Sequence, residues 1–173
     1  MARLPYAKED QDEEVAALAA QIRKERGQMH NLYLMLLNSP PVARGWLGLL
    51  TAVRQQCKLP GRFRELAILR IALLNRAHYE YEGHVPFALK AGLSQQQIDG
   101  LPNWKTSKLF TEIERAVLTY TEAMTKDIQV PDAVFAALQP HFATRELTEL
   151  TATIATYNLV SRFLEALKID SDH

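Results

Sequence analysis

The sequence predicts an all-α protein, a compact single-domain bundle of about eight helices that spans residues 1–173. Apolar residues recur at three- and four-residue spacing through most of the chain, and no segment alternates apolar and polar residues over the length of a strand. Helix start and stop residues separate the apolar segments. A chain of 173 residues can bury most of its apolar surface around one core, and no repeat or long linker divides it.

The first third of the chain predicts three helical segments. Gly27 can end the first helix, 31–37 is a short apolar segment, and Ser39 with Pro40 and Pro41 opens a helix whose body is 43–56. The residues expected to face inward are Val15, Leu18, Ala19 and Ile22 in the first helix and Trp46, Leu49, Leu50 and Val53 in the third. Leu59-Pro60-Gly61 is a break.

The middle of the chain predicts a helical hairpin. Residues 63–74 are apolar nearly all round, which indicates burial at the centre of the domain or in a subunit interface. An unbroken helix from there to His84 would place Glu65 and His84 about 28 Å apart, at 1.5 Å per residue. Asn75 is a plausible interruption, so we expect a second helix at 78–91, stopped by Gly92, that brings the two ends closer.

The last part of the chain contains further helix start signals. Ser94 with Gln97 and Thr111 with Glu114 have the spacing of capping boxes. A loop is expected at 103–110. Another helix should lie between Pro131 and Pro140, and the final helix is expected at 145–169 with Thr144 as its cap.

Composition excludes several classes of function. Lys plus Arg equal Asp plus Glu at 20 each, so no basic field favours nucleic acid as a partner. No segment has the 18 or more consecutive apolar residues of a membrane span, and the first residues lack the apolar segment of a secretory signal. We therefore expect a soluble, cytoplasmic protein. The single cysteine, Cys57, rules out an intrachain disulfide and a multi-cysteine zinc site.

Glu80 and His84 are the first candidates for chemistry. Four-residue spacing places them on one helix face, where a carboxylate can orient an imidazole that gives and takes protons near neutral pH. Tyr81 adds a ring and a hydroxyl beside them. An exposed Glu-His pair without a function would have the same spacing, so spacing alone leaves both interpretations open.

Other residues could complete a site. Glu65, among apolar residues, either faces solvent in the first helical turn or is buried with a partner. Arg64 and Arg162 could bind an anionic substrate, with Asn158 on the same face as Arg162, although surface ion pairs are the alternative for each arginine. We expect no metal, because carboxylate and imidazole ligands normally include more than one histidine at recognisable spacing.

The segment Leu59-Pro-Gly-Arg-Phe-Arg-Glu-Leu-Ala-Ile-Leu-Arg70, together with Tyr79-Glu-Tyr-Glu-Gly-His84 and Ala88-Leu-Lys-Ala-Gly-Leu-Ser94, resembles the carboxymuconolactone decarboxylase and alkylhydroperoxidase D-like proteins. A weaker similarity lies at 155–162. The peroxidase branch of that family carries a Glu, then Cys-x-x-Cys-x-x-x-His, with nineteen residues from acid to histidine. The acid aligns with Glu65 and the histidine with His84, while Ala77 and Glu80 occupy the cysteine positions.

The resemblance therefore implies the decarboxylase-type branch, whose members tend to have Tyr-Glu-Trp-x-x-His here. It implies a cofactor-independent lyase acting on a small carboxylated lactone or related unsaturated acid, with His84 as proton donor, Glu80 as its partner and Glu65 behind them. Two alternatives remain: an alkylhydroperoxidase-like antioxidant that depends on Cys57, and a non-catalytic protein that binds small molecules. Because family members form dimers, trimers or hexamers, a homo-oligomer is expected.

Overall fold

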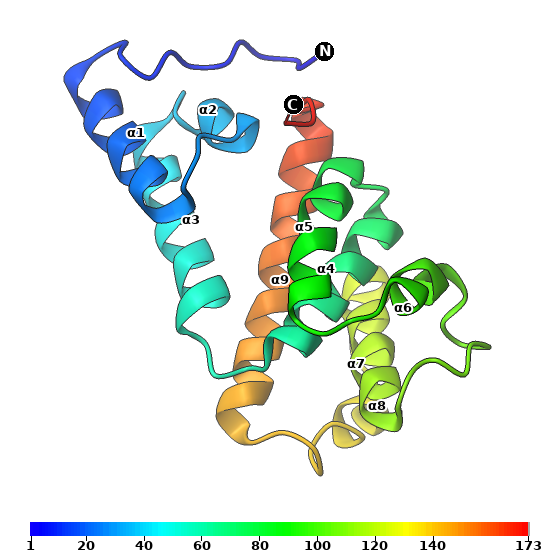
Figure 1. Cartoon of the computed structure of the whole chain (residues 1–173). Helices are drawn as coiled ribbons and strands as arrows, with labels where there is room; N and C mark the ends of the chain where they lie inside the picture. The colour runs from blue at the N-terminus through cyan, green and yellow to red at the C-terminus, as the bar shows by residue number, and fades with distance from the viewer. Residues whose placement is uncertain (173) are drawn as a thin grey trace. The chain divides into compact units, whose positions relative to one another are not determined.

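The computed structural model describes residues 1–172, in which the chain forms nine α-helices and no β-strand (Figure 1). The all-α prediction is confirmed. The helices are α1 (Glu13–Arg26), α2 (Asn31–Leu36), α3 (Pro40–Thr51), α4 (Gly61–Asn75), α5 (His78–Lys90), α6 (Gln95–Gly100), α7 (Glu112–Glu122), α8 (Asp132–Ala136) and α9 (Thr144–Leu167). Short π-helical turns follow α3 and α7, at Ala52–Gln56 and Ala123–Asp127. None of the helices within 1–172 is long and apolar enough to cross a membrane.

The chain divides into two compact units. The first contains Met1–Gln56 and the residues from Phe163 onward, and the second contains Cys57–Arg162. The prediction of a single domain stays a prediction. All but one of the candidate residues of the sequence lie well inside the second unit, and Arg162 is its last residue.

The first unit is built on packing of α1 and α2 against α3. Asp12 caps α1 by accepting a 2.8 Å hydrogen bond from the backbone N–H of Val15, and Gly27 ends it with φ 82°. The predicted inward face of α1 is confirmed. The prediction for Leu49 is wrong, because 43% of this side chain is exposed while Leu47 is buried instead. The buried stripe of α3 contains Ala43, Trp46, Leu47 and Leu50.

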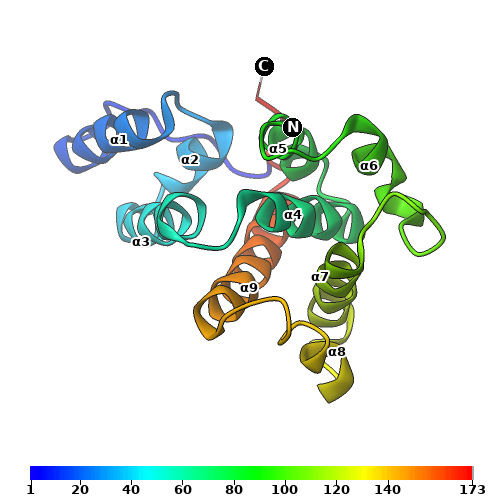
Figure 2. The same cartoon turned by 60° about the horizontal axis from the view of Figure 1, so that its bottom comes forward.

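The second unit contains the predicted helical hairpin, in which α4 and α5 run side by side (Figure 2). Arg76 ends α4 in the left-handed conformation with φ 57°, one residue after the predicted interruption at Asn75. The core of α4 is fully buried, with 0% exposure from Leu66 to Leu69. α4 also packs against α7, so its apolar residues are buried at the centre of the second unit.

The helix boundaries in the rest of the second unit follow the predicted signals. Both capping boxes are present, at Ser94 with Gln97 and at Thr111 with Glu114. Gly92 has φ 94° after the end of α5. The helix expected between the prolines is only Asp132–Ala136, and α9 begins at Thr144 itself, with the backbone N–H of Ala143 bonded to Glu146.

Candidate functional site

The hairpin joins Glu65 to His84. The carboxylate Oε2 of Glu65, in the first turns of α4, lies 2.7 Å from Nδ1 of His84 in α5. Both residues are buried, with 2% and 8% exposure. The turn at Arg76 makes this contact possible, because a straight helix would hold the two residues about 28 Å apart. Of the two possibilities left open for Glu65, the structure has the buried one with a partner.

The charge of Glu65 is stabilised from two sides. Burial raises the pKa of its carboxyl, but the hydrogen bond and positive charge of His84 and the Nε donor of Arg64 outweigh burial, and the pKa is lowered overall. The Arg64 bond is 3.0 Å long and goes to Oε1, so each carboxylate oxygen has a separate partner. Since an ionised carboxylate only accepts, Nδ1 of His84 must carry the proton in this bond. That tautomer directs Nε2 away from Glu65.

Glu80 is buried one helical turn before His84, with 2% exposure. Its two carboxylate oxygens each lie 3.0 Å from the hydroxyl of Ser161 in α9. No local pattern marks Ser161, because this contact joins residues 81 positions apart in the chain. The resemblance implied that Glu65 lies behind Glu80 and His84, and the structure shows that Glu65 itself bonds the His84 ring.

Aromatic rings surround the His84 imidazole. The Tyr157 ring of α9 meets it edge-on, with centroids 4.9 Å apart and planes at 90°. Phe87 lies 5.8 Å away on the α5 side, and 46% of this residue is exposed. The rings restrict the orientation of the imidazole, and 11% of the His84 side chain remains accessible to solvent.

The other predicted binding residues lie in different surroundings. Tyr81 is half-buried, and burial together with the negative charge of Asp99 raises the pKa of its phenol. Asn158 is buried and bonded to Asn75 and Thr125. Arg162 donates to the backbone and side-chain oxygens of Asn158 at 3.0 and 2.8 Å, which confirms the shared face predicted from their spacing. The structure does not test whether these residues bind a substrate.

The single cysteine is poorly suited to nucleophilic chemistry. Cys57 is half-buried, and burial and the negative charge of Glu149 raise the pKa of its thiol. A thiol is a much weaker nucleophile than a thiolate. Ala77, at the N-cap position of α5, and Glu80 have no sulfur. The chemistry available at Glu65 and His84 is therefore proton transfer.

The fold is that of the alkylhydroperoxidase D core. An alkylhydroperoxidase AhpD core protein from Ralstonia eutropha JMP134, described as an uncharacterized peroxidase-related protein, matches with a TM-score of 0.83 at 18% identity, covering 99% of this chain and 92% of that one. The debrominase Bmp8 in complex with 2,3,4-tribromopyrrole matches with a TM-score of 0.82 at 15% identity, covering 99% and 94%. At these identities the likeness concerns the fold alone.

Two further relatives and a family profile give the classification. The profile of the carboxymuconolactone decarboxylase family matches residues 40–123. The uncharacterized protein YnjA of Escherichia coli K12 is 33% identical over 127 residues, which are 72% of this chain and 66% of that relative, just under two thirds of its length. A protein of unknown function from Agrobacterium tumefaciens, provisionally described as the antioxidant defence protein AhpD, is 29% identical, with a TM-score of 0.73 over 79% of this chain and 94% of that one.

The chain belongs to the carboxymuconolactone decarboxylase and AhpD-like family. Family membership was the expectation from the segment between Leu59 and Ser94, and it is confirmed. The family includes enzymes of different chemistry, so the particular reaction has to be inferred from the residues of this chain.

Proposed function

We propose that the protein is a cofactor-independent lyase that decarboxylates a small carboxylated lactone or a related unsaturated acid by proton transfer. The buried hydrogen bond between Glu65 and His84 carries this proposal, because it orients an imidazole in a site that has no cysteine. A carboxylate bonded to Nδ1 fixes the tautomer and favours the imidazolium form, which is the form that donates a proton from Nε2.

The proposed reaction balances without a metal or an organic cofactor. The substrate carboxylate leaves as carbon dioxide, and the electron pair of the broken carbon–carbon bond moves into the conjugated carbonyl to form an enolate. The His84 imidazolium then transfers its Nε2 proton to carbon and becomes neutral, and water restores the proton. Glu65 stays ionised throughout and holds the ring in place, and general acid catalysis of this kind contributes about 10²–10⁴-fold in rate.

We propose roles for the other candidate residues near Glu65 and His84. Arg64 is the closest cation to it, bonded to Glu65 through Nε, and we propose its Nη donors for the substrate carboxylate. Glu80, bonded to Ser161 and one helical turn before His84, stays the proposed proton-sharing partner of the imidazole. Tyr81, Asn158 and Arg162 stay proposed binding residues.

The test uses a panel of carboxylated γ-lactones, with carbon dioxide release as the readout. In D2O the product should carry one deuterium at the carbon that lost the carboxylate, because the transferred proton comes from an exchangeable ring N–H. We expect His84→Ala to lose about 10²–10⁴-fold in kcat. His141→Ala removes an exposed histidine of the same unit and is the matched control. Full turnover by a folded His84→Ala variant would refute the proposal.

A peroxide-reducing antioxidant is the second candidate, favoured by the Agrobacterium tumefaciens relative at 29% identity. A disulfide-cycling peroxidase needs one thiolate to attack the peroxide and a second thiol to resolve the sulfenic acid. This chain has only Cys57, so any such activity would need a thiol from another molecule. Peroxide consumption that Cys57→Ser abolishes would support this candidate over the lyase.

The third candidate is a binding protein that keeps the fold without the chemistry. Native mass spectrometry that finds a small molecule retained after purification, together with no turnover on the lactone panel, would favour it. We propose a homo-oligomer for any of the three functions, since the resemblance implies a dimer, trimer or hexamer. Light scattering that finds only monomer would remove that proposal.

A further inference from the structure

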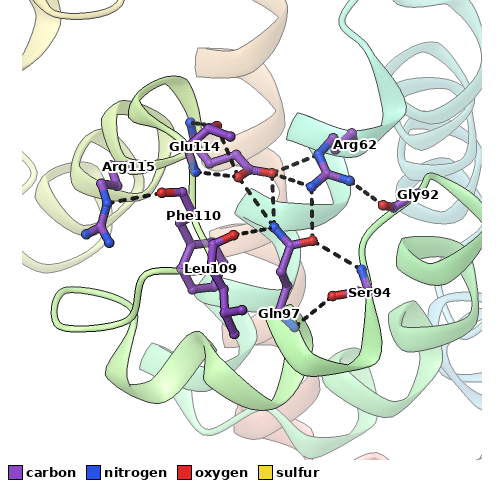
Figure 3. A network of polar contacts seen from close by, with 9 residues as sticks. Arg62, Gly92, Ser94, Gln97, Leu109, Phe110, Glu114 and Arg115 are labelled. Carbon is purple, nitrogen blue, oxygen red and sulfur yellow. Dashed lines mark hydrogen bonds and ion pairs between the residues drawn. The ribbon is translucent and has the colours of Figure 1, made fainter.

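A second buried carboxylate, Glu114, lies in a polar network at the first turn of α7 (Figure 3). Only 1% of Glu114 is exposed. Its Oε1 accepts from Nε of Arg62 at 2.7 Å and lies 2.6 Å from Nη2 of the same residue. Its Oε2 accepts from the backbone N–H of Thr111 at 2.8 Å, which closes the capping box of α7. Glu114 therefore holds both a helix start and the guanidinium of Arg62.

Arg62 connects three segments of the second unit through its guanidinium. Besides Glu114, it donates to the side-chain oxygen of Gln97 at 3.0 Å and to the backbone oxygen of Gly92 (Figure 3). Gln97 is the capping-box residue of α6, and Gly92 lies just beyond the end of α5. The planar fork of an arginine suits this arrangement, because its separate donors reach different acceptors at the same time.

The position of Arg62 relative to Glu65 gives this network a consequence for the candidate site. The two residues are three positions apart on α4, so they lie within about 60° of each other around the helix and are about 4.5 Å apart along it. Arginine and glutamate at this spacing readily form an ion pair. Glu65, however, bonds Arg64 through Oε1 and His84 through Oε2. A second arginine could reach Glu65 only by competing with these partners.

We propose that Glu114 is a positioning residue: it holds the Arg62 guanidinium at the start of α7, so that Glu65 remains bonded to His84. Without the negative charge of Glu114, Arg62 turns toward Glu65 and weakens the hold of its carboxylate on the His84 ring. The effect on catalysis rests on the function proposed above. The effect on the Glu65–His84 bond does not, because it is measured without a substrate.

The test reads the Nδ1 proton of His84 by NMR, as a ring N–H hydrogen-bonded to a carboxylate resonates far downfield. The resonance is assigned by its loss in His84→Ala. Glu114→Gln removes the charge and keeps an amide oxygen for the capping box. We expect this variant to shift the resonance upfield and to speed its exchange with water. The double variant Arg62→Gln/Glu114→Gln should restore the wild-type signal, because no competing guanidinium remains.

A purely structural role of the network predicts different results. If the network only braces the helices, the double variant should perturb the resonance at least as much as Glu114→Gln, and that outcome would overturn the proposal. So would an unchanged resonance in a folded Glu114→Gln variant. If Glu114→Gln fails to fold, Arg62→Gln alone decides: we expect the signal to be kept, and its loss in the folded protein counts against the proposal.

Arg115→Gln is the matched control for loosening of this corner. Arg115 donates to the backbone oxygens of Trp104 and Phe110, both at 3.2 Å, and of Ser107. Removing these bonds loosens the segment from Trp104 to Phe110, but Arg62 keeps its own partners. We expect the His84 resonance to stay in place. If it moves as much as in Glu114→Gln, local loosening explains the effect and the proposed competition is wrong. If no substrate is ever turned over, the lyase proposal fails while these spectra still decide the role of Glu114.

Discussion

Protonation of one carboxylate, Glu122 in α7, should weaken the contact between α4 and α7 at low pH. This residue is 7% exposed and accepts hydrogen bonds from Nε and Nη2 of Arg70 at 3.0 and 2.5 Å. The indole N–H of Trp104 donates to it at 2.7 Å. Burial raises the pKa of the Glu122 carboxyl, but the bonds from Trp104, Arg70 and Lys105 outweigh burial and lower it to about 2.

The size of the effect follows from the change in protonation. A pKa that falls from 4.5 to about 2 corresponds to about 3 kcal/mol of stability, at 1.36 kcal/mol for each pH unit. Part of the lowered pKa comes from Lys105, whose side chain is 67% exposed and screened by solvent, so about 2–3 kcal/mol is the better figure. Because the folded pKa is the lower one, this stability is present above about pH 4.5 and is lost as the pH falls toward 2.

The measurement compares urea unfolding of the wild type and Glu122→Gln at pH 7, 5, 4 and 3. At pH 7 we expect the variant to be less stable by about 3–5 kcal/mol, because Arg70 stays buried without its partner. This difference should narrow by about 2 kcal/mol at pH 3. Glu112→Gln, which removes an exposed carboxylate from the same helix, is the control. A difference between wild type and Glu122→Gln that stays constant from pH 7 to 3 would refute the reasoning.

Three further predictions concern single positions. Because burial and Glu149 raise the pKa of the Cys57 thiol, its alkylation by iodoacetamide should keep accelerating beyond pH 9, and a plateau below pH 8 would contradict this. Gly92→Ala should lower the free energy of unfolding by about 1–2 kcal/mol, since φ is 94° there, whereas Gly83→Ala on the exposed face of α5 should raise it by about 0.5–1 kcal/mol. Ile128 is 81% exposed with φ 63°, so Ile128→Gly should stabilise the protein by about 1 kcal/mol in urea unfolding, and a loss of stability would show that the side chain matters.

The boundaries of the helices could be predicted where a single residue determines the backbone. Gly27 and Gly92 end helices in conformations that glycine adopts without strain, and the two capping boxes use side chains three residues apart. Leu49 could not be placed, because spacing alone fits Leu47 or Leu49 to the buried face and only packing in the first unit decides between them. The left-handed residue Arg76 has no local signal either, since arginine has no preference for that conformation.

The candidate site was predictable in its residues and only partly in its bonds. Glu65 and His84 follow from the resemblance, and the hairpin that joins them follows from the interruption near Asn75. Ser161 and Tyr157 reach the site from α9, far along the chain, and such contacts have no sequence period. For the same reason the sequence could show that Glu80 and His84 share a helix face, but not that Glu65 on the neighbouring helix bonds the ring.

The two positions without cysteine, Ala77 and Glu80, take no part in the bond between Glu65 and His84. Of the two positions aligned with the family's cysteines, Ala77 is the N-cap residue of α5 and Glu80 lies within α5, whereas the bond that orients His84 comes from α4. A thiol near the N-terminus of a helix has a lowered pKa, so Ala77 removes a position suited to a reactive thiolate. Neither change requires Glu65 to move. The proposed proton transfer therefore needs neither of the aligned positions, and it rests on Glu65 and His84.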